Sequence, residues 1–289
     1  MNLAVLPRPA CREATIGEQR DAGTARFFEG TYSMLTFLIC TLAGLFAGIG
    51  TGLSGLSAAA VISPMLMAFL GFDPYEAVGI ALASDVLASA VSAYIYGKNK
   101  NLDIRGGVAM LLSVLVFTAV GSFFASLISS EMLGTCSVFV TFVLGLKFIL
   151  RPVMRTKEIM KKTSGAIHLL KSVVGGAAIG LVCGFVGAGG GMMMLIVLTS
   201  VLGYELKTAV GTSVFIMTFT ALTGAVSHFA IVGGISSPVE LLICMIFTFI
   251  GARVSSLFAN RESPRVLNRA TGMVLTLLGA IMIGIYFLK

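Results

Sequence analysis

Long apolar runs separated by short clusters of charge make up most of this 289-residue chain. An α-helix of about 20 apolar residues spans the hydrocarbon core of a bilayer, which is about 30 Å thick. The chain is 57% hydrophobic and 11% charged, whereas soluble proteins average about 25% charged residues. We therefore predict an all-α, polytopic integral membrane protein. Ten apolar segments can be marked: 34–53, 56–70, 75–97, 106–128, 132–150, 168–187, 190–202, 207–231, 238–259 and 265–288.

Positive charge is concentrated between these segments and predicts their orientation. The linker 147–171 holds seven Lys and Arg residues, and such loops stay on the cytoplasmic side. Counting outward places 98–105 and 260–265 on the same side, each with its own Lys or Arg. The net charge of +7 therefore indicates cytoplasmic loops and a cell-membrane location, and not a nucleic-acid partner. Loops without Lys or Arg fall outside: 71–74, 129–131 and 232–237.

The two halves of the chain repeat each other at a shift of 132 residues. Leu70-Gly71 falls on Leu202-Gly203 without a gap, and the glycines agree in register. Because the charge count starts the two halves on opposite sides, we predict an inverted-topology repeat, the architecture of many secondary transporters. The predicted organisation is a disordered tail over 1–33, a first repeat over 34–150, a basic cytoplasmic linker over 151–167 and a second repeat over 168–289.

Two segments, 56–70 and 190–202, are too short to cross a bilayer, and each follows a glycine-rich break. A helix of that length rises about 20 Å, so we predict broken, half-membrane helices. Their N-termini would present free N–H groups and a positive dipole end at mid-membrane, which is a cradle for an anion. The candidate substrate-binding residues at the breaks are Ser54, Gly55, Ser57, Gly187, Gly189, Gly190 and Gly191.

Glycines four residues apart precede both breaks. Small residues at this spacing let transmembrane helices pack closely, and we favour this role over substrate binding. The six glycines are Gly44, Gly48, Gly52, Gly176, Gly180 and Gly184.

The stretch "GFVGAGGGMMMLIVLTSVLGYELKTAVGTSVF" at 184–215 resembles the glycine-rich element and following helix start of the TauE/SafE membrane permeases, also called sulfite exporters. The resemblance covers nearly the whole chain from residue 34. It implies transport of small sulfur-containing or organic anions such as sulfite, sulfonates and sulfoacetate, and it adds Thr212 and Ser213 as pathway candidates. The first copy departs from this pattern, with Leu56-Ser57-Ala58-Ala59 in place of the glycine run.

Asp85 lies near the middle of segment 75–97. A carboxylate at that depth is costly and by default functional, so we predict that it takes up a coupling proton or binds a cation such as sodium. The alternative is a neutral Asp that is hydrogen-bonded to Ser84, Ser89 or a neighbouring helix. Its counterpart in the repeat is Met217, so such a role belongs to one half only.

Other classes of protein fit the sequence less well. Gly52-Leu53-Ser54-Gly55 has the form of a serine-protease motif with His228 as base, but the repeat keeps its glycines and replaces Ser54 by Val186. An ion channel or a membrane accessory protein stays open as an alternative to a transporter. Five Cys and two His predict neither a metal site nor a cofactor, and the cysteines are expected to pack as small hydrophobes. The expected partners are a small anion and the lipid bilayer.

Overall fold

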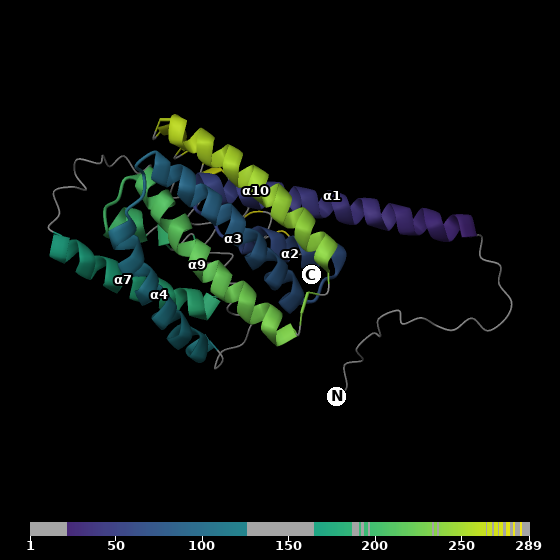
Figure 1. The fold of residues 1–289 in the computed structure, drawn as a ribbon, viewed down its shortest axis with the longest axis horizontal. Helices are drawn as coiled ribbons and strands as arrows, with labels where there is room; N and C mark the ends of the chain where they lie inside the picture. The colour runs from purple at the N-terminus through teal and green to yellow at the C-terminus, as the bar shows by residue number, and fades with distance from the viewer. Residues whose placement is uncertain are drawn as a thin grey trace. The chain divides into compact units, whose positions relative to one another are not determined.

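The computed structural model describes residues 22–125, 165–186 and most of 191–273, with scattered positions up to 284. The chain divides into two compact units, Met1–Leu35 and Thr36–Lys289, and the packing described below belongs to the second. All regular structure in the described residues is helical (Figure 1). The elements are α1 (Ala22–Ser54), α2 (Ala59–Leu70), α3 (Pro74–Lys98), α4 (Ile104–Ala125), α7 (Gly165–Val186), the π-helical η1 (Val197–Val201), α9 (Leu206–Val232) and α10 (Pro238–Arg261).

Four helices in the described part of the chain are long and apolar enough to cross a membrane. The prediction of a multi-pass helical membrane protein is therefore confirmed. The helix bounds lie within a few residues of the predicted segments, whereas segment 132–150 lies outside the described residues. The predicted tail 1–33 differs in its second part, because α1 begins at Ala22. The four spans are Met34–Ser54, Glu76–Lys98, Leu206–Val226 and Pro238–Arg261.

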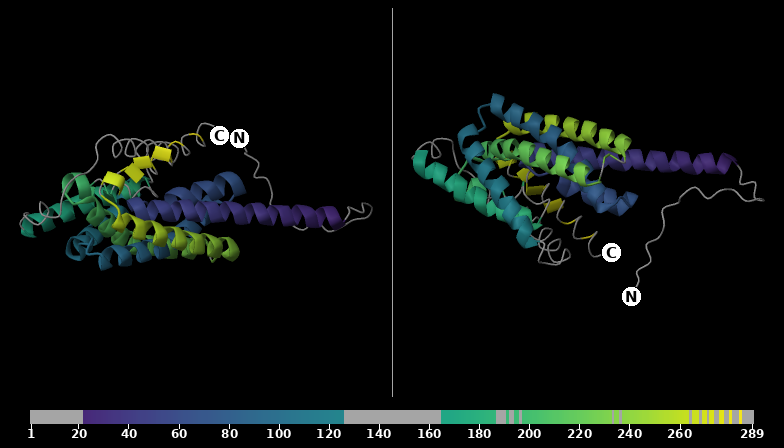
Figure 2. Two further views of the ribbon diagram at one scale, coloured as in Figure 1. Left: turned by 90° about the horizontal axis from the view of Figure 1, so that it is seen from above. Right: turned by 60° about the horizontal axis from the view of Figure 1, so that its bottom comes forward.

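Glycines spaced four residues apart, here called the glycine stripes, pack two helix pairs closely: Gly44, Gly48 and Gly52 pack α1 on α10, and Gly176 and Gly180 pack α7 on α4 (Figure 2). A Cβ on Gly48 would lie 2.7 Å from the backbone nitrogen of Ala252. A Cβ on Gly180 would lie 2.6 Å from the carbonyl oxygen of Val114. Backbone cannot give way at these distances, so only glycine fits. The predicted packing role is confirmed at Gly44, Gly48, Gly52, Gly176 and Gly180.

Helices α3 and α9 form the centre of the bundle and run antiparallel (Figure 1). Gly211 near the start of α9 packs against Tyr96 near the end of α3, and Gly224 packs against Leu82. Each of these helices has a parallel neighbour, α10 beside α3 and α4 beside α9. The middle residues of α3, from the first half, therefore lie against those of α9, from the second half.

The described helices fall into two sets by direction. The glycine contacts make α1 parallel to α10 and α7 parallel to α4. The bonds Ser237–Glu76 and Ser256–Ser92 make α10 parallel to α3. Helices α1, α3 and α10 therefore run one way, and α4, α7 and α9 run the other way. The counterparts α1 and α7, α3 and α9, and α4 and α10 are thus antiparallel. The inverted repeat itself stays a prediction. Which ends face the cytoplasm stays a prediction.

Both short helical segments end in the same way. Gly71 and Gly203 have positive φ of 66° and 74°, a conformation that glycine adopts without steric cost. The next amide folds back each time, with Phe72 N–H donating to Leu66 O at 3.3 Å and Tyr204 N–H donating to Leu198 O at 2.8 Å. The second copy differs in the π-helical turn η1 before its glycine.

Candidate functional site

Helix α1 ends at Ser54, at the first glycine-rich break, and two hydroxyls of its last turn bond to carbonyls of the turn before. The hydroxyl of Thr51 donates to Ala47 O at 3.0 Å, and that of Ser54 donates to Gly50 O at 2.6 Å. Such bonds to the preceding turn loosen and bend a helix. Gly55 then turns the chain with φ of 64°. Ser54 is fully buried and its proton is held by its own helix, so the structure gives it a carbonyl acceptor in place of a catalytic base.

The first break meets the start of the second short segment in the core of the protein. Gly191 opens the short segment of the second copy, and a Cβ added to it would lie 2.6 Å from Gly55 O, 2.8 Å from Ser57 N and 2.8 Å from Met217 Sδ. A Cβ on Gly55 would in turn collide with Ser213 Oγ. Backbone of the first break therefore lies against Gly191, the first described residue after the predicted second break. Gly187, Gly189 and Gly190 lie outside the described residues.

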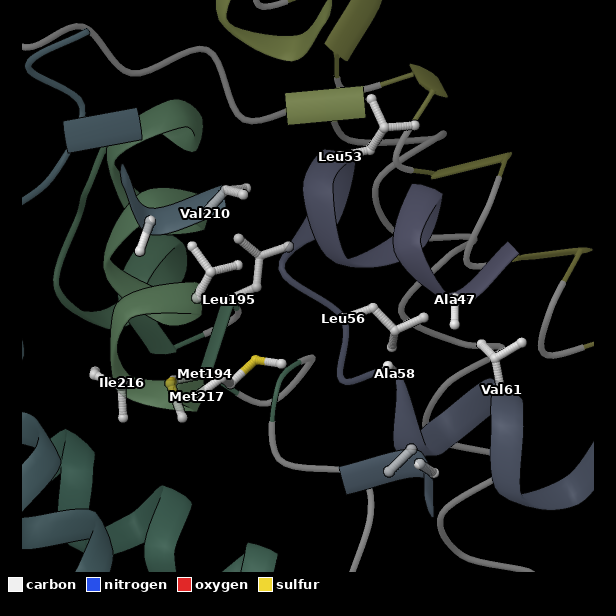
Figure 3. Packing of buried hydrophobic residues seen from close by; sticks show 14 of the residues in the cluster. Ala47, Leu53, Leu56, Ala58, Val61, Met194, Leu195, Val210, Ile216 and Met217 are labelled. Carbon is white, nitrogen blue, oxygen red and sulfur yellow. The ribbon is translucent and has the colours of Figure 1, made fainter. Parts of the chain in front are cut away.

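Apolar side chains surround this meeting point. Figure 3 shows Leu56 and Ala58 of the first break in the same part of the core as Met194, Leu195 and Met217 of the second copy. These side chains are at most 2% exposed. Polar groups at the breaks are thus held in a low-dielectric surrounding, where an unpaired one is costly.

Asp85 is bonded directly to the first break. Its carboxylate is 1% exposed and accepts hydrogen bonds from Ser57 Oγ at 2.7 Å and Ser89 Oγ at 2.9 Å. The backbone N–H of Ala58 also acts on it. Ser84, the other expected neighbour, donates to Ile80 O instead, at 2.8 Å. Asp85 is therefore hydrogen-bonded to Ser89, as expected, and also to Ser57, a candidate at the break whose contact with Asp85 the sequence did not predict. Whether Asp85 takes up a proton or binds a cation stays a prediction.

The two residues of the Thr-Ser pair at the start of α9, Thr212 and Ser213, contact different parts of the protein. Ser213 is fully buried, faces Gly55 at the break and donates to Val210 O at 2.9 Å. Thr212 turns to α4 instead, where its hydroxyl accepts a hydrogen bond from Asp103 N at 3.2 Å. Of the two, Ser213 is the residue that the structure brings to the breaks. The side chain of His228 lies outside the described residues.

Sequence reasoning missed a fully buried tyrosine beside the first break. Tyr96 OH donates to Gly52 O at 2.8 Å and so ties the end of α3 to the last turn of α1. Because Tyr96 and Gly52 lie far apart in the sequence, no local sequence pattern could have predicted this contact.

A polar layer at one end of the bundle was also missed. Tyr204 OH donates to Asp103 Oδ2 at 2.5 Å, and burial together with this carboxylate raises the pKa of Tyr204 above its usual range. Asn101 donates to Asn260 at 2.7 Å, and Lys207 Nζ donates to Asn260 O at 3.0 Å. The layer joins α4, α9 and α10 at the end of the bundle where loops 98–105 and 260–265, by their charge, are predicted to face the cytoplasm.

Comparison with known proteins decides the family. The family described as Sulfite exporter TauE/SafE matches residues 40–282, a range that includes both breaks, α3 and α9. The chain belongs to the TauE/SafE family. The resemblance inferred from residues 184–215 is confirmed.

Relatives within the TauE/SafE family carry transporter names. "Probable membrane transporter protein YunE" of Bacillus subtilis is 24% identical, covering 86% of this chain and 98% of the relative. "Probable membrane transporter protein YdhB" of the same organism is 26% identical, covering 86% and 100%. "Probable membrane transporter protein MJ0441" of Methanocaldococcus jannaschii is 22% identical, covering 86% and 96%. No solved structure matches the chain.

The expected role of cysteine in this TauE/SafE chain agrees with the structure where it is described. Cys40 and Cys244 are free and buried, and they lie where α1 packs on α10, with Cys244 Sγ 3.8 Å from Cys40 O. They act as small residues in a close helix contact. In the described part of the chain, no three His, Cys, Asp or Glu residues gather in a way that could hold a metal ion.

Proposed function

We propose that this protein is a secondary transporter that carries a small anion through the region where the two breaks meet. The observation that carries the proposal is the backbone contact of Gly191 with Gly55 and Ser57. The first interruption lies far in sequence from Gly191, which follows the predicted second one, and α3 and α9 both place residues beside this contact. Discontinuous helices that meet near mid-membrane are where many secondary transporters bind substrate.

The chemistry of the breaks supports an anion as the substrate. Helix N-termini offer N–H groups and a positive dipole end, and the serine hydroxyls nearby are further donors. We infer a small sulfur oxyanion, a sulfonate or another small organic anion, in keeping with the family description. The residues proposed to line its path are Ser54, Gly55, Ser57, Gly187, Gly189, Gly190, Gly191, Thr212 and Ser213.

The helix directions support alternating access. Antiparallel counterparts in two halves are what an inverted repeat uses to exchange inward-open and outward-open states around one fixed site. We propose that α1–α4 and the second half from α7 onward exchange roles in this way. The packing glycines allow close helix contact without side chains that interlock.

Thermal denaturation of the purified protein tests this function. We expect sulfite, thiosulfate, a sulfonate or a small carboxylate to raise the melting temperature, because a ligand that binds only the folded state stabilises it by mass action. Ser213→Ala should weaken the shift, since Ser213 faces the break. Ser84→Ala is the matched control, because its hydroxyl bonds within α3. A broad anion panel without any shift would contradict the proposal, and flux independent of any gradient of H⁺ or Na⁺ would favour a channel.

A further inference from the structure

We propose that Asp85 serves as a built-in anion at the N-terminus of α2, and that a proton taken up by Asp85 releases the break between α1 and α2. The inference rests on the proposed transport function and assigns the first break a different task from the second. The first break would be the proton-controlled element of the transporter, and it would accept the transported anion only after this release.

The geometry around Ser57 makes it a link between three elements. Its hydroxyl donates to Asp85 Oδ2 at 2.7 Å and accepts a hydrogen bond from Ala59 N–H at 3.3 Å. Ala59 is the first residue of α2, and Asp85 lies in α3. One side chain thus joins the end of the break, the first turn of α2 and the middle of α3. The Ala58 amide adds a backbone group of the break to the same carboxylate.

The set of groups around Asp85 favours a proton over a metal cation. Two hydroxyls and one amide direct hydrogens toward the carboxylate, whereas Na⁺ is held by oxygen lone pairs. A cation would have to turn both serines away first. No charged side chain of the described residues acts on Asp85, so no built-in counter-ion holds the carboxylate in its charged form. Met217 replaces it in the second copy, so the repeat supplies no second carboxylate at this position.

Protonation changes what Asp85 can do for the break. An ionised carboxylate only accepts hydrogen bonds, whereas the acid has one hydroxyl donor and less acceptor capacity. It then holds the three donors less strongly, and the negative charge opposite the positive end of α2 is gone. That helix end becomes available to an outside anion. Proton uptake and anion binding would therefore promote each other, as linkage requires.

Hydrogen–deuterium exchange of the full-length protein tests the inference without substrate. We expect the amides of residues 55–60 to exchange faster at acidic than at neutral pH, after correction for the intrinsic rate. Asp85→Asn, which imitates the neutral acid, should exchange fast at both pH values. Ser57→Ala should raise exchange at neutral pH by roughly tenfold to hundredfold, the effect of losing one hydrogen bond to a charged group. Ser84→Ala should behave as the wild type.

The outcomes separate this inference from the proposed function. If Asp85→Asn keeps both the protection and the pH dependence of the wild type, the inference is overturned, and Asp85→Asn decides the matter even if Ser57→Ala fails to fold. A break that opens with acid and with Asp85→Asn supports the inference even when no anion of the panel binds. In that case the proposed anion transport is what fails.

Discussion

The described surroundings of the first break and of the predicted second break share a framework and differ in chemistry. Each follows a helix packed through glycines, and each precedes a short segment that ends in a glycine of positive φ. Yet the first break is bonded to a buried carboxylate through Ser57, whereas the second brings Gly191 against Met217. Small residues give both halves the same architecture. The hydrogen-bonded pair Ser57 and Asp85 is what distinguishes the first half from the second.

That inequality separates two tasks that a symmetric transporter would combine. A glycine-only break suits close approach of backbone or substrate. A break held by an ionisable group responds to pH. The comparison therefore predicts that changes at Asp85 act on coupling, while changes at the packing glycines act on stability in both halves alike.

The largest effect is expected at Asp85, and its counterpart Met217 serves as the control. Asp85→Asn should abolish coupled transport while leaving expression intact, because the variant keeps the shape of the side chain and loses the titrating group. Met217→Leu should keep transport and cost less than about 1.5 kcal/mol of stability, since it conserves volume. Uptake or efflux assays in cells measure both. Transport at the wild-type level in Asp85→Asn would remove the functional difference between the breaks.

The contact between the breaks should be the next most sensitive place. In Gly191→Ala the added methyl meets the backbone of Gly55 and Ser57, so we expect a loss of about 1–3 kcal/mol of stability and strongly reduced transport. Gly284→Ala is the control, because a Cβ there meets nothing within 4 Å. Equal melting temperatures and transport rates in the two variants would show that the breaks are not packed as described.

The glycine stripes should respond alike in both halves. Gly48→Ala and Gly180→Ala each press a methyl into backbone of the facing helix, so each should cost about 1–3 kcal/mol with little change in substrate affinity. Thermal denaturation in detergent, with and without a bound anion, measures both quantities. A large change in substrate affinity in either variant would show that these glycines act in substrate binding and not only in helix packing.

The smallest effect is expected at Tyr96. Tyr96→Phe removes the hydroxyl bonded to Gly52 O and should cost about 0.5–1.5 kcal/mol, the net value of one neutral hydrogen bond. Leu87→Ala, on an exposed position of the same helix, is the control for helix α3. Chemical denaturation followed by circular dichroism suits the comparison. If the stability of Tyr96→Phe equals that of the wild type, the hydroxyl of Tyr96 does not stabilise the first break.

The sequence predicted what depends on local pattern. Apolar run length gave helix bounds such as Pro238–Arg261 for segment 238–259, and glycine spacing predicted a close helix contact, which α1 makes with α10. It could not predict the bond of Ser57 to Asp85 or of Tyr204 to Asp103, because these form only when distant helices pack. Residues 22–33, which the sequence assigned to the tail, continue the α1 helix in the structure. The π-helical turn η1 has no distinct pattern in its residues.

Anion flux into proteoliposomes under an imposed pH gradient tests the central claim most directly. The account predicts that wild-type protein moves a small anion of the sulfite, sulfonate or carboxylate class at a rate set by the gradient, and that Asp85→Asn removes this dependence. Flux that is the same in both proteins, or no flux of any anion in the panel, would contradict it.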